Sequence, residues 1–267
     1  MPIHPTAIIH PGAELDSSVE VGPCAVIDEH VKIGPGCRIW AHAHVTGHTT
    51  MGESNQVHMG AVVGHWPQHL AYDPAKVSRL SVGANNVFRE YSVIHGSFAD
   101  GECTVIGDEC LFMNQSHVAH DCHLGSRVII ATCSMLAGHV TLGDSVFISG
   151  LSGAHQNVRV GRLAMISGLT RITQDVPPFM TLLGESEVIG LNTVGIRRAG
   201  INPDTRLKIK RAYKNIYFEG RTTPQAAAHL QETADCPEVE ELAEFLATTQ
   251  RGISGHRRSK RDEATNG

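Results

Sequence analysis

Apolar residues recur at every sixth position over most of this chain of 267 residues. The series runs from Ile3 to Val63, resumes from Val82 to Ile94 and continues from Ile106 to Ile172. A period of six fits neither an α-helix nor a simple alternating strand. It fits a short strand and a corner, repeated three times per coil of about 18 residues, with coils stacked about 4.8 Å apart. The pattern therefore predicts a parallel β-helix of hexapeptide repeats whose apolar side chains fill a prism.

Small residues support this interpretation. Glycine often follows the apolar residue, as at Gly22, Gly34 and Gly107, and we expect it to supply the positive φ of a tight corner. Small residues four places after the apolar position, such as Ala25 and Ala43, would let the corner close. Left-handed coiling is typical of hexapeptide-repeat proteins and is expected here, although parallel connections are usually right-handed.

The repeat is interrupted twice and ends before the C-terminus. Residues 65–81 and 96–104 break the count, and we expect both to leave the prism as loops, a common location for functional residues. Two prolines, Pro177 and Pro178, end the repeat. The division predicted from the sequence is a β-helix domain at 1–178, a linker at 179–200, a helical domain at 201–250 and a disordered tail at 251–267.

Composition excludes several classes of protein. A formal net charge of -5 argues against general nucleic-acid binding. No apolar run approaches the about 18 residues of a membrane span, so no integral membrane segment is expected. The first residues lack the features of a signal peptide, and the seven cysteines are scattered without a CxxC motif, which indicates a reducing cytoplasm.

The densest polar cluster lies at residues 114–122. His120 points out of the prism in repeat register, and adding one and two coils gives Gly138 and Gln156. These three residues should form a ladder on one external face, flanked by His139 and His155. A neutral imidazole in such a ladder can take a proton from a hydroxyl group, as acyl transfer to a sugar requires.

Two further groups would complete this chemistry. The carboxylate of Asp121 could fix the tautomer of the neighbouring imidazole, and the Gly138 N–H could stabilise an oxyanion. The simpler interpretation is that each histidine is only a surface residue, because the chain has 17. His117, His120 and His123 also resemble a metal-ligand run, but on a hexapeptide coil they face different directions, so no metal is expected.

Several stretches resemble the cytoplasmic UDP-N-acetylglucosamine O-acyltransferase family, which begins lipid A synthesis. The matching stretches are HVAHDC (117–122), LAGHV (136–140), AHQ (154–156), QDVPP (174–178), GLN (190–192), GIRRAG (195–200) and RAYKNIYFEG (211–220). The resemblance covers nearly the whole chain. It implies a homotrimer with active sites between subunits, an acyl carrier protein thioester as donor, a UDP-sugar as acceptor, and neither metal nor cofactor.

The resemblance also implies residue roles. By motif, His120 matches the general base, Asp121 its partner and Gly138 the oxyanion donor. Residues that match substrate contacts are His117, His139, His155 and Gln156, with Asn192 and Arg198 at the nucleotide phosphates. Gly168 matches the position that sets acyl length, where glycine leaves room for a longer chain.

Four positions depart from the family pattern. His69 and Ala71 stand where the family usually has an acidic and a basic residue, Val194 lies near a usual acidic residue, and Ala199 replaces a second arginine. His69 is retained as a candidate substrate contact. These positions bear on the nucleotide sugar, so they leave open a different nucleotide (amino) sugar as acceptor. Two other functions are also left open: a zinc lyase like the gamma-type carbonic anhydrases, and a non-catalytic relative that binds a nucleotide sugar. Acyl length and a coenzyme A donor are also left open.

Overall fold

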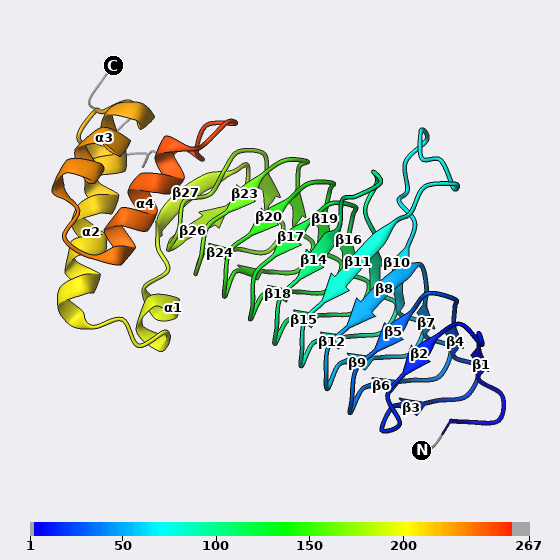
Figure 1. Cartoon of the computed structure of the whole chain (residues 1–267). Helices are drawn as coiled ribbons and strands as arrows, with labels where there is room; N and C mark the ends of the chain where they lie inside the picture. The colour runs from blue at the N-terminus through cyan, green and yellow to red at the C-terminus, as the bar shows by residue number, and fades with distance from the viewer. Residues whose placement is uncertain (1–2, 258–267) are drawn as a thin grey trace.

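A computed structural model describes residues 3–257. The chain winds into a three-sided prism with helices at its C-terminal end (Figure 1). The first sheet contains β1 (Ile8–Ile9), β4 (Val26–Ile27), β7 (His44–Val45), β10 (Val62–His65), β13 (Val93–His95), β16 (His117–Val118), β19 (Met135–Leu136), β22 (Gly153–Ala154) and β25 (Arg171–Ile172).

The other two sides are built in the same way. The second sheet contains β2 (Glu14–Leu15), β5 (Lys32–Ile33), β8 (His48–Met51), β11 (Arg79–Val82), β14 (Thr104–Ile106), β17 (His123–Leu124), β20 (Thr141–Leu142) and β23 (Arg159–Val160). The third sheet contains β3 (Glu20–Val21), β6 (Arg38–Ile39), β9 (Gln56–Val57), β12 (Val87–Phe88), β15 (Leu111–Phe112), β18 (Ile129–Ile130), β21 (Phe147–Ile148), β24 (Met165–Ile166), β26 (Met180–Leu183) and β27 (Glu187–Leu191).

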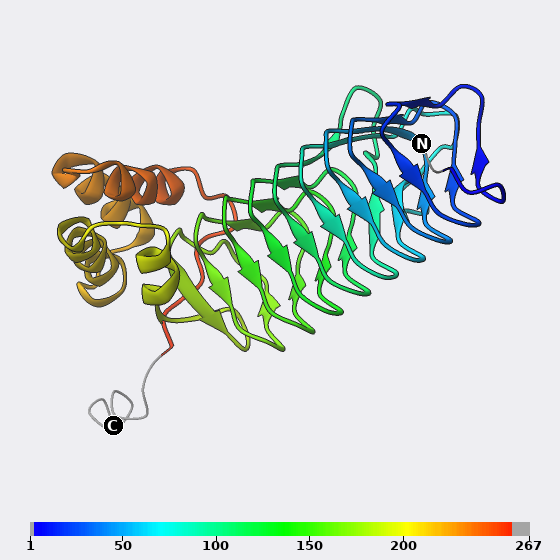
Figure 2. The same ribbon diagram turned by 90° about the horizontal axis from the view of Figure 1, so that it is seen from below.

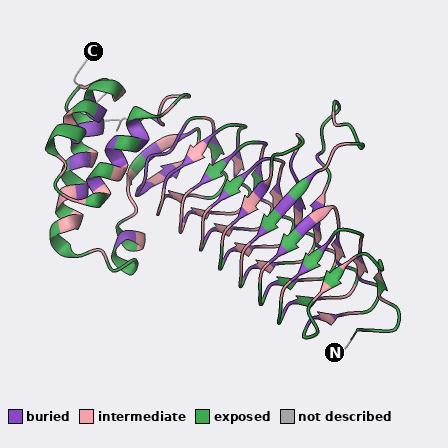
Figure 3. Cartoon of the chain, viewed as in Figure 1, coloured by how far each residue is buried: buried purple, intermediate pink, exposed green. Residues whose placement is uncertain are grey.

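The register between coils follows the predicted 18-residue spacing. Strand β16 pairs in parallel with β19, so that Val118 lies beside Leu136, and both side chains are fully buried. Buried positions recur along the strands of the prism (Figure 3). The parallel β-helix predicted from the apolar period is therefore confirmed.

The expected reason for the repeated glycines is wrong. The positive-φ position lies three residues after the apolar one and is mostly not glycine, as at Asp121 (φ 57°) and His139 (φ 60°). Gly34 does not have a positive φ, but a Cβ on it would lie 2.8 Å from the backbone of Gly52 in the next coil. Glycine is needed there because adjacent coils approach too closely for any side chain.

Both interruptions leave the prism as predicted, at the corner between the first and second sheets. The longer one connects β10 to β11 and projects from the side of the prism in Figure 1, and the shorter one connects β13 to β14. These loops interrupt the corner one and two coils before His120.

The predicted linker at 179–200 is wrong, because this segment completes the β-helix. Strand β26 pairs in parallel with β24, and β27 pairs antiparallel with β26. Phe179, Leu182 and Val188 are fully buried, so they extend the core after the six-residue period has ended. A short helix, α1 (Thr193–Arg198), follows.

Three helices lie within the predicted helical region: α2 (Pro203–Phe218), α3 (Thr223–Thr233) and α4 (Pro237–Ala247). Each begins with proline in its first turn, where the missing N–H costs nothing. They stack at the C-terminal end of the prism (Figure 2). An ion pair of 2.8 Å between Arg162 and Glu241 joins the last coils to α4. Between residues 3 and 257, no helix is both long and apolar enough to cross a membrane.

The prediction of a disordered tail is wrong for residues 251–257. Ile253 bridges Asp175, and His256 bridges Val188 and lies 2.7 Å from the hydroxyl of Tyr213. The two bridges are made by backbone atoms, so the basic composition of the predicted tail does not indicate them. Residues 258–267 of the predicted tail lie outside the described residues.

Candidate active site

The proposed general base lies at the corner between the first and second sheets. His120 follows strand β16, and its ring lies directly over the backbone of Gly138 in the next coil. A Cβ on Gly138 would lie 2.7 Å from Cε1 and 2.8 Å from Nε2 of His120. Among the described residues, no acceptor pairs with the Gly138 N–H. The structure therefore brings together a ring nitrogen and a free backbone donor, as the 18-residue ladder predicts.

Asp121 is held in a fixed orientation beside this imidazole. Its Oδ2 lies 2.7 Å from His120 Nδ1, and the Phe98 N–H donates to both carboxylate oxygens at 3.2 Å. Its own N–H donates to Thr104 Oγ1 at 2.8 Å. Since the carboxylate can only accept, it fixes the His120 proton on Nδ1 and leaves the Nε2 lone pair free.

The environment of Asp121 also favours its charged form. Burial alone raises the pKa of this carboxyl group, which is only 7% exposed. The hydrogen bonds from His120 and the Phe98 N–H, together with the charges of His120 and His139, outweigh burial and hold the pKa below its ordinary value. A charged carboxylate can stabilise the imidazolium that forms when His120 takes a proton.

Two more imidazoles surround this pair. His139 Nε2 lies 3.7 Å from Asp121 Oδ2, and its ring is 5.1 Å from that of His120. His69, from the longer loop, packs edge-on against Phe98 at 4.7 Å and against His120 at 5.9 Å. The departure from the family pattern at His69 therefore lies beside His120. Ala71 is exposed on the same loop.

His117 occupies an outward position on β16, one strand position before buried Val118. Burial, followed by the nearby His95, lowers the pKa of His117 to about 4. The ring is therefore neutral near pH 7 and has one donor and one acceptor nitrogen.

An arginine that was not predicted from the sequence lies at the far end of the ladder, beside His155. Gln156 and His155 are exposed at the corner two coils after His120. Arg251 Nη2 lies 3.4 Å from His155 Nδ1 and donates to the Thr173 carbonyl at 3.1 Å. Arg251 was missed because it falls in the predicted tail. Phe98 was missed because it acts through its backbone N–H, which no sequence pattern identifies.

The structure does not gather the three histidines of the metal-ligand run into one cluster. Side-chain ligand atoms of His120, Asp121 and His139 lie within 4.8 Å of one another, but His117 and His123 do not belong to this group. The closest pair in it is already occupied by the His120–Asp121 hydrogen bond.

The candidate nucleotide residues lie elsewhere in the chain. Asn192, Arg198, Val194 and Ala199 line a cavity of about 1000 Å³ beside outward side chains of the third sheet. The Asn192 side chain accepts from the Gly195 N–H and donates to a backbone carbonyl, so both of its polar groups are already paired. Arg198 is exposed. A single chain does not bring these residues to the corner that holds His120.

Gly168 lies at a third location, the corner between the third and first sheets. A Cβ there would meet only the carbonyl oxygen of Gly150 at 3.4 Å and one side-chain atom at 4.0 Å. Leu151 and Leu169 lie on the same corner and are 63% and 74% exposed. The surface around Gly168 is therefore open and apolar.

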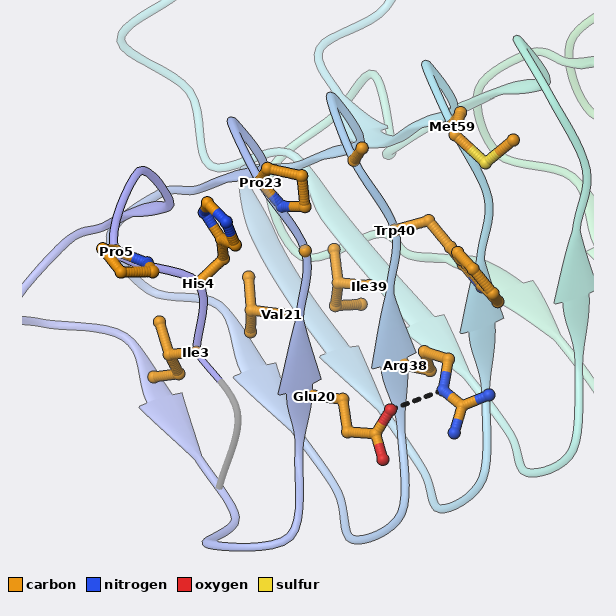
Figure 4. A pocket seen from close by; sticks show the side chains of 12 residues that line it. Ile3, His4, Pro5, Glu20, Val21, Pro23, Arg38, Ile39, Trp40 and Met59 are labelled. Atoms are coloured by element: carbon orange, nitrogen blue, oxygen red, sulfur yellow. Dashed lines mark hydrogen bonds and ion pairs between the residues drawn. The ribbon is translucent and has the colours of Figure 1, made fainter.

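A further cavity, of about 660 Å³, lies against the third sheet near the N-terminal end (Figure 4). Ile3, Val21, Ile39 and Trp40 line it, and an ion pair of 2.7 Å between Arg38 and Glu20 crosses its edge. None of the candidate site residues belongs to it.

Two family models and many named relatives match this chain. The family described as "Udp N-acetylglucosamine O-acyltransferase; Domain 2" matches residues 175–254, and "Bacterial transferase hexapeptide (six repeats)" matches residues 103–138. The acyl-(acyl-carrier-protein)–UDP-N-acetylglucosamine O-acyltransferase of Paraburkholderia phytofirmans is 43% identical over 259 residues, which cover 94% of this chain and 98% of that protein. The Paraburkholderia xenovorans protein of the same name is 41% identical over 258 residues, with the same shares covered.

Solved structures extend the comparison to the fold. The UDP-N-acetylglucosamine acyltransferase from Campylobacter jejuni is 36% identical with a TM-score of 0.90, over 95% of this chain and 99% of that one. The left-handed parallel β-helix expected from the repeat is thereby confirmed. The chain belongs to the UDP-N-acetylglucosamine O-acyltransferase family.

Proposed function

We propose that this protein transfers an acyl chain, such as a 3-hydroxyacyl chain, from acyl carrier protein to the 3-hydroxyl of UDP-N-acetylglucosamine, the reaction that begins lipid A synthesis. The names of relatives at about 40% identity support the reaction. The observation that carries the mechanism is the His120 ring, paired with Asp121 at 2.7 Å and lying over Gly138.

In this mechanism His120 Nε2 takes the proton of the sugar hydroxyl while the oxygen attacks the thioester carbonyl carbon. The Gly138 N–H donates to the developing oxyanion, and Asp121 stabilises the imidazolium. When the tetrahedral intermediate collapses, the C–S bond breaks and the thiolate leaves with the proton from His120. A positioned general base contributes about 10²–10⁴-fold and an oxyanion donor about 10²–10³-fold.

The test is direct. The purified protein is incubated with a panel of acyl carrier protein thioesters, coenzyme A thioesters and UDP-sugars, and the products are identified by mass spectrometry. We expect acylated UDP-N-acetylglucosamine from carrier protein donors, and at least a hundredfold loss in His120→Ala. Turnover near that of the unchanged protein in folded His120→Ala would contradict the mechanism.

We also propose a homotrimer in which a neighbouring subunit completes each site. The support is that Arg198 and the His120 corner lie on different sides of one chain, although both belong to motifs of the same family. A guanidinium group suits a phosphate of the nucleotide, so Arg198→Ala should raise the acceptor KM about tenfold. Arg197→Ala is the matched control, since Arg197 is exposed on the same helix but does not line the cavity.

Mixed trimers test this arrangement. When His120→Ala and Arg198→Ala chains are assembled together, about one quarter of the sites should contain both intact residues if the two come from different subunits. Activity at low acceptor concentration should then exceed that of either variant alone. No recovery, or sedimentation as a monomer at micromolar concentration, would contradict the shared site.

Roles of the remaining residues follow from the same proposal. His69, His117, His139, His155 and Gln156 contact the substrates around the base, and Gly168 with its exposed leucine neighbours receives the acyl chain. We further propose a cytoplasmic location, which the seven free thiols support.

A further inference from the structure

His95 is a buried histidine that the mechanism above does not use. It ends strand β13, one coil before His117 in the first sheet, and it is 2% exposed. Its ring lies 5.0 Å from that of His117, with the two planes tilted by 58°. It therefore forms the inner neighbour of a proposed substrate contact.

The proton on His95 is assigned by its partner. Nδ1 lies 2.7 Å from the carbonyl oxygen of Trp66, at the start of the longer loop. A carbonyl can only accept, so Nδ1 carries a hydrogen and donates it. Burial is the largest influence on the pKa of His95 and lowers it, so the ring is neutral and its Nε2 is a bare acceptor.

That acceptor has no donor among the described residues, although it is fully buried. An unpaired buried polar atom is destabilising, because it has lost its hydrogen bonds to water without replacement, so an explanation for this one is needed. The His117 ring, at 5.0 Å, lies nearer to the His95 ring than the ring of His65 does, at 6.4 Å. The rings of His95 and His117 are close enough for a hydrogen bond after a small ring rotation, or through one water molecule.

We infer that His95 is a positioning residue: the Trp66 carbonyl holds Nδ1–H of His95, and Nε2 of His95 accepts the N–H of His117. This chain fixes His117 in one neutral tautomer, whose other nitrogen faces the site as a hydrogen-bond acceptor. His117 then selects a substrate group that donates, such as a sugar hydroxyl or an amide N–H. The inference rests on the proposed function to the extent that His117 contacts substrate.

A double-mutant cycle separates this role from a structural one. His95→Met removes both polar groups at similar size, and His95→Gln keeps one donor and one acceptor. Both are made in the unchanged chain and in His117→Gln, and kcat and KM are measured for donor and acceptor. Exposed His123→Met controls for the loss of any histidine. Melting temperature and sedimentation show that each variant is folded.

We expect His95→Met to lower kcat/KM about tenfold in the unchanged chain, and by less than about twofold when His117 is already glutamine. His95→Gln should recover most of the loss. An equal loss on both backgrounds would mean that His95 acts only on stability, and no loss would remove the role altogether.

A second measurement does not depend on turnover. In protein labelled with ¹⁵N in its histidine rings, the His117 signals are identified by their absence in His117→Gln. One neutral tautomer is expected in the unchanged protein, and two tautomers in exchange in His95→Met. If the unchanged protein shows two tautomers of His117, the inference is wrong. This result does not depend on whether His95→Met folds, or on which acceptor the protein acylates.

Discussion

Replacing Asp121 with asparagine tests the catalytic geometry most sharply, because it changes the charge and hardly the shape. The Phe98 N–H faces the carboxylate and needs an acceptor, so the asparagine Oδ1 should turn toward it. The asparagine NH2 group then faces His120 Nδ1, which must accept instead of donate. The proton of His120 moves to Nε2, and the ring can no longer take a proton from the sugar hydroxyl.

The size of the effect follows from the two things that are lost. The wrong tautomer removes general-base catalysis, worth about 10²–10⁴-fold, and the missing charge removes stabilisation of the imidazolium. The same substitution in a Ser-His-Asp hydrolase lowers kcat by about 10⁴. We therefore expect kcat to fall by about 10³–10⁴, or about 4–5.5 kcal/mol of barrier.

The assay is single-turnover formation of acylated UDP-sugar, with binding of the acceptor measured separately by calorimetry. Asp28→Asn is the matched control. Asp28 Oδ2 lies 2.8 Å from His44 Nε2, so this variant breaks an aspartate–histidine pair of the same kind at an earlier coil of the same corner. Its turnover should stay within about twofold of the unchanged protein, since it lies outside the proposed site.

A loss below tenfold in Asp121→Asn, with melting temperature and acceptor affinity preserved, would refute the reasoning. It would mean that the carboxylate sets neither the tautomer nor the charge of His120. An equal loss in Asp28→Asn would show that any such pair affects the fold rather than the reaction.

Three more predictions follow. Gly138→Ala should lower kcat at least a hundredfold, because the added Cβ would displace the His120 ring. The control is Gly255→Ala, whose added Cβ meets no atom within 4 Å and should leave turnover unchanged. If the two variants turn over equally fast, the His120 ring does not lie against Gly138 as described. Gly168→Met should shift the preferred donor toward shorter acyl chains in a thioester panel, and an unchanged preference would exclude this corner as the acyl pocket. His117 has its pKa lowered from 6.5 to about 4 in the folded chain, so the unfolded chain binds its proton first and stability falls as pH decreases between those values. In chemical unfolding between pH 7 and pH 4, His117→Gln should reduce the change in the free energy of unfolding by up to about 3 kcal/mol. If the variant and the unchanged protein lose the same stability over this range, the ring of His117 is not buried in its neutral form.

The apolar period made the prism and the ladder predictable. Because one coil is 18 residues, the adjacency of His120 and Gly138 follows from counting alone, and the structure places them in contact. Counting also predicted that His117, His120 and His123 face different directions, and His117 and His123 do not belong to the cluster of ligand atoms around His120. Wherever the repeat is regular, position in the sequence determines position in space.

The segments after the repeat could not be predicted in the same way. The segment that contains Phe179 and Val188 continues the core without the six-residue period, because an antiparallel strand needs no such spacing. Residues 251–257 pair through backbone atoms, which their basic side chains do not reveal. The glycines that follow the apolar residues are necessary, as predicted, but for another reason. They are required by close contact with the backbone of the next coil, and not by a positive φ.

The two loops explain why the site lies where the repeat is broken. In a regular coil most backbone N–H and C=O groups pair with the coils on either side, so few are left to hold a side chain. The interruption at 96–104 provides the Phe98 N–H that fixes Asp121, and the interruption at 65–81 provides the Trp66 carbonyl that fixes His95. Each loop thus supplies a backbone group to the second residue of a pair: Asp121 beside His120, and His95 beside His117. The period of the β-helix therefore sets the spacing of the candidate catalytic side chains, and the loops that interrupt this period provide backbone groups that orient them.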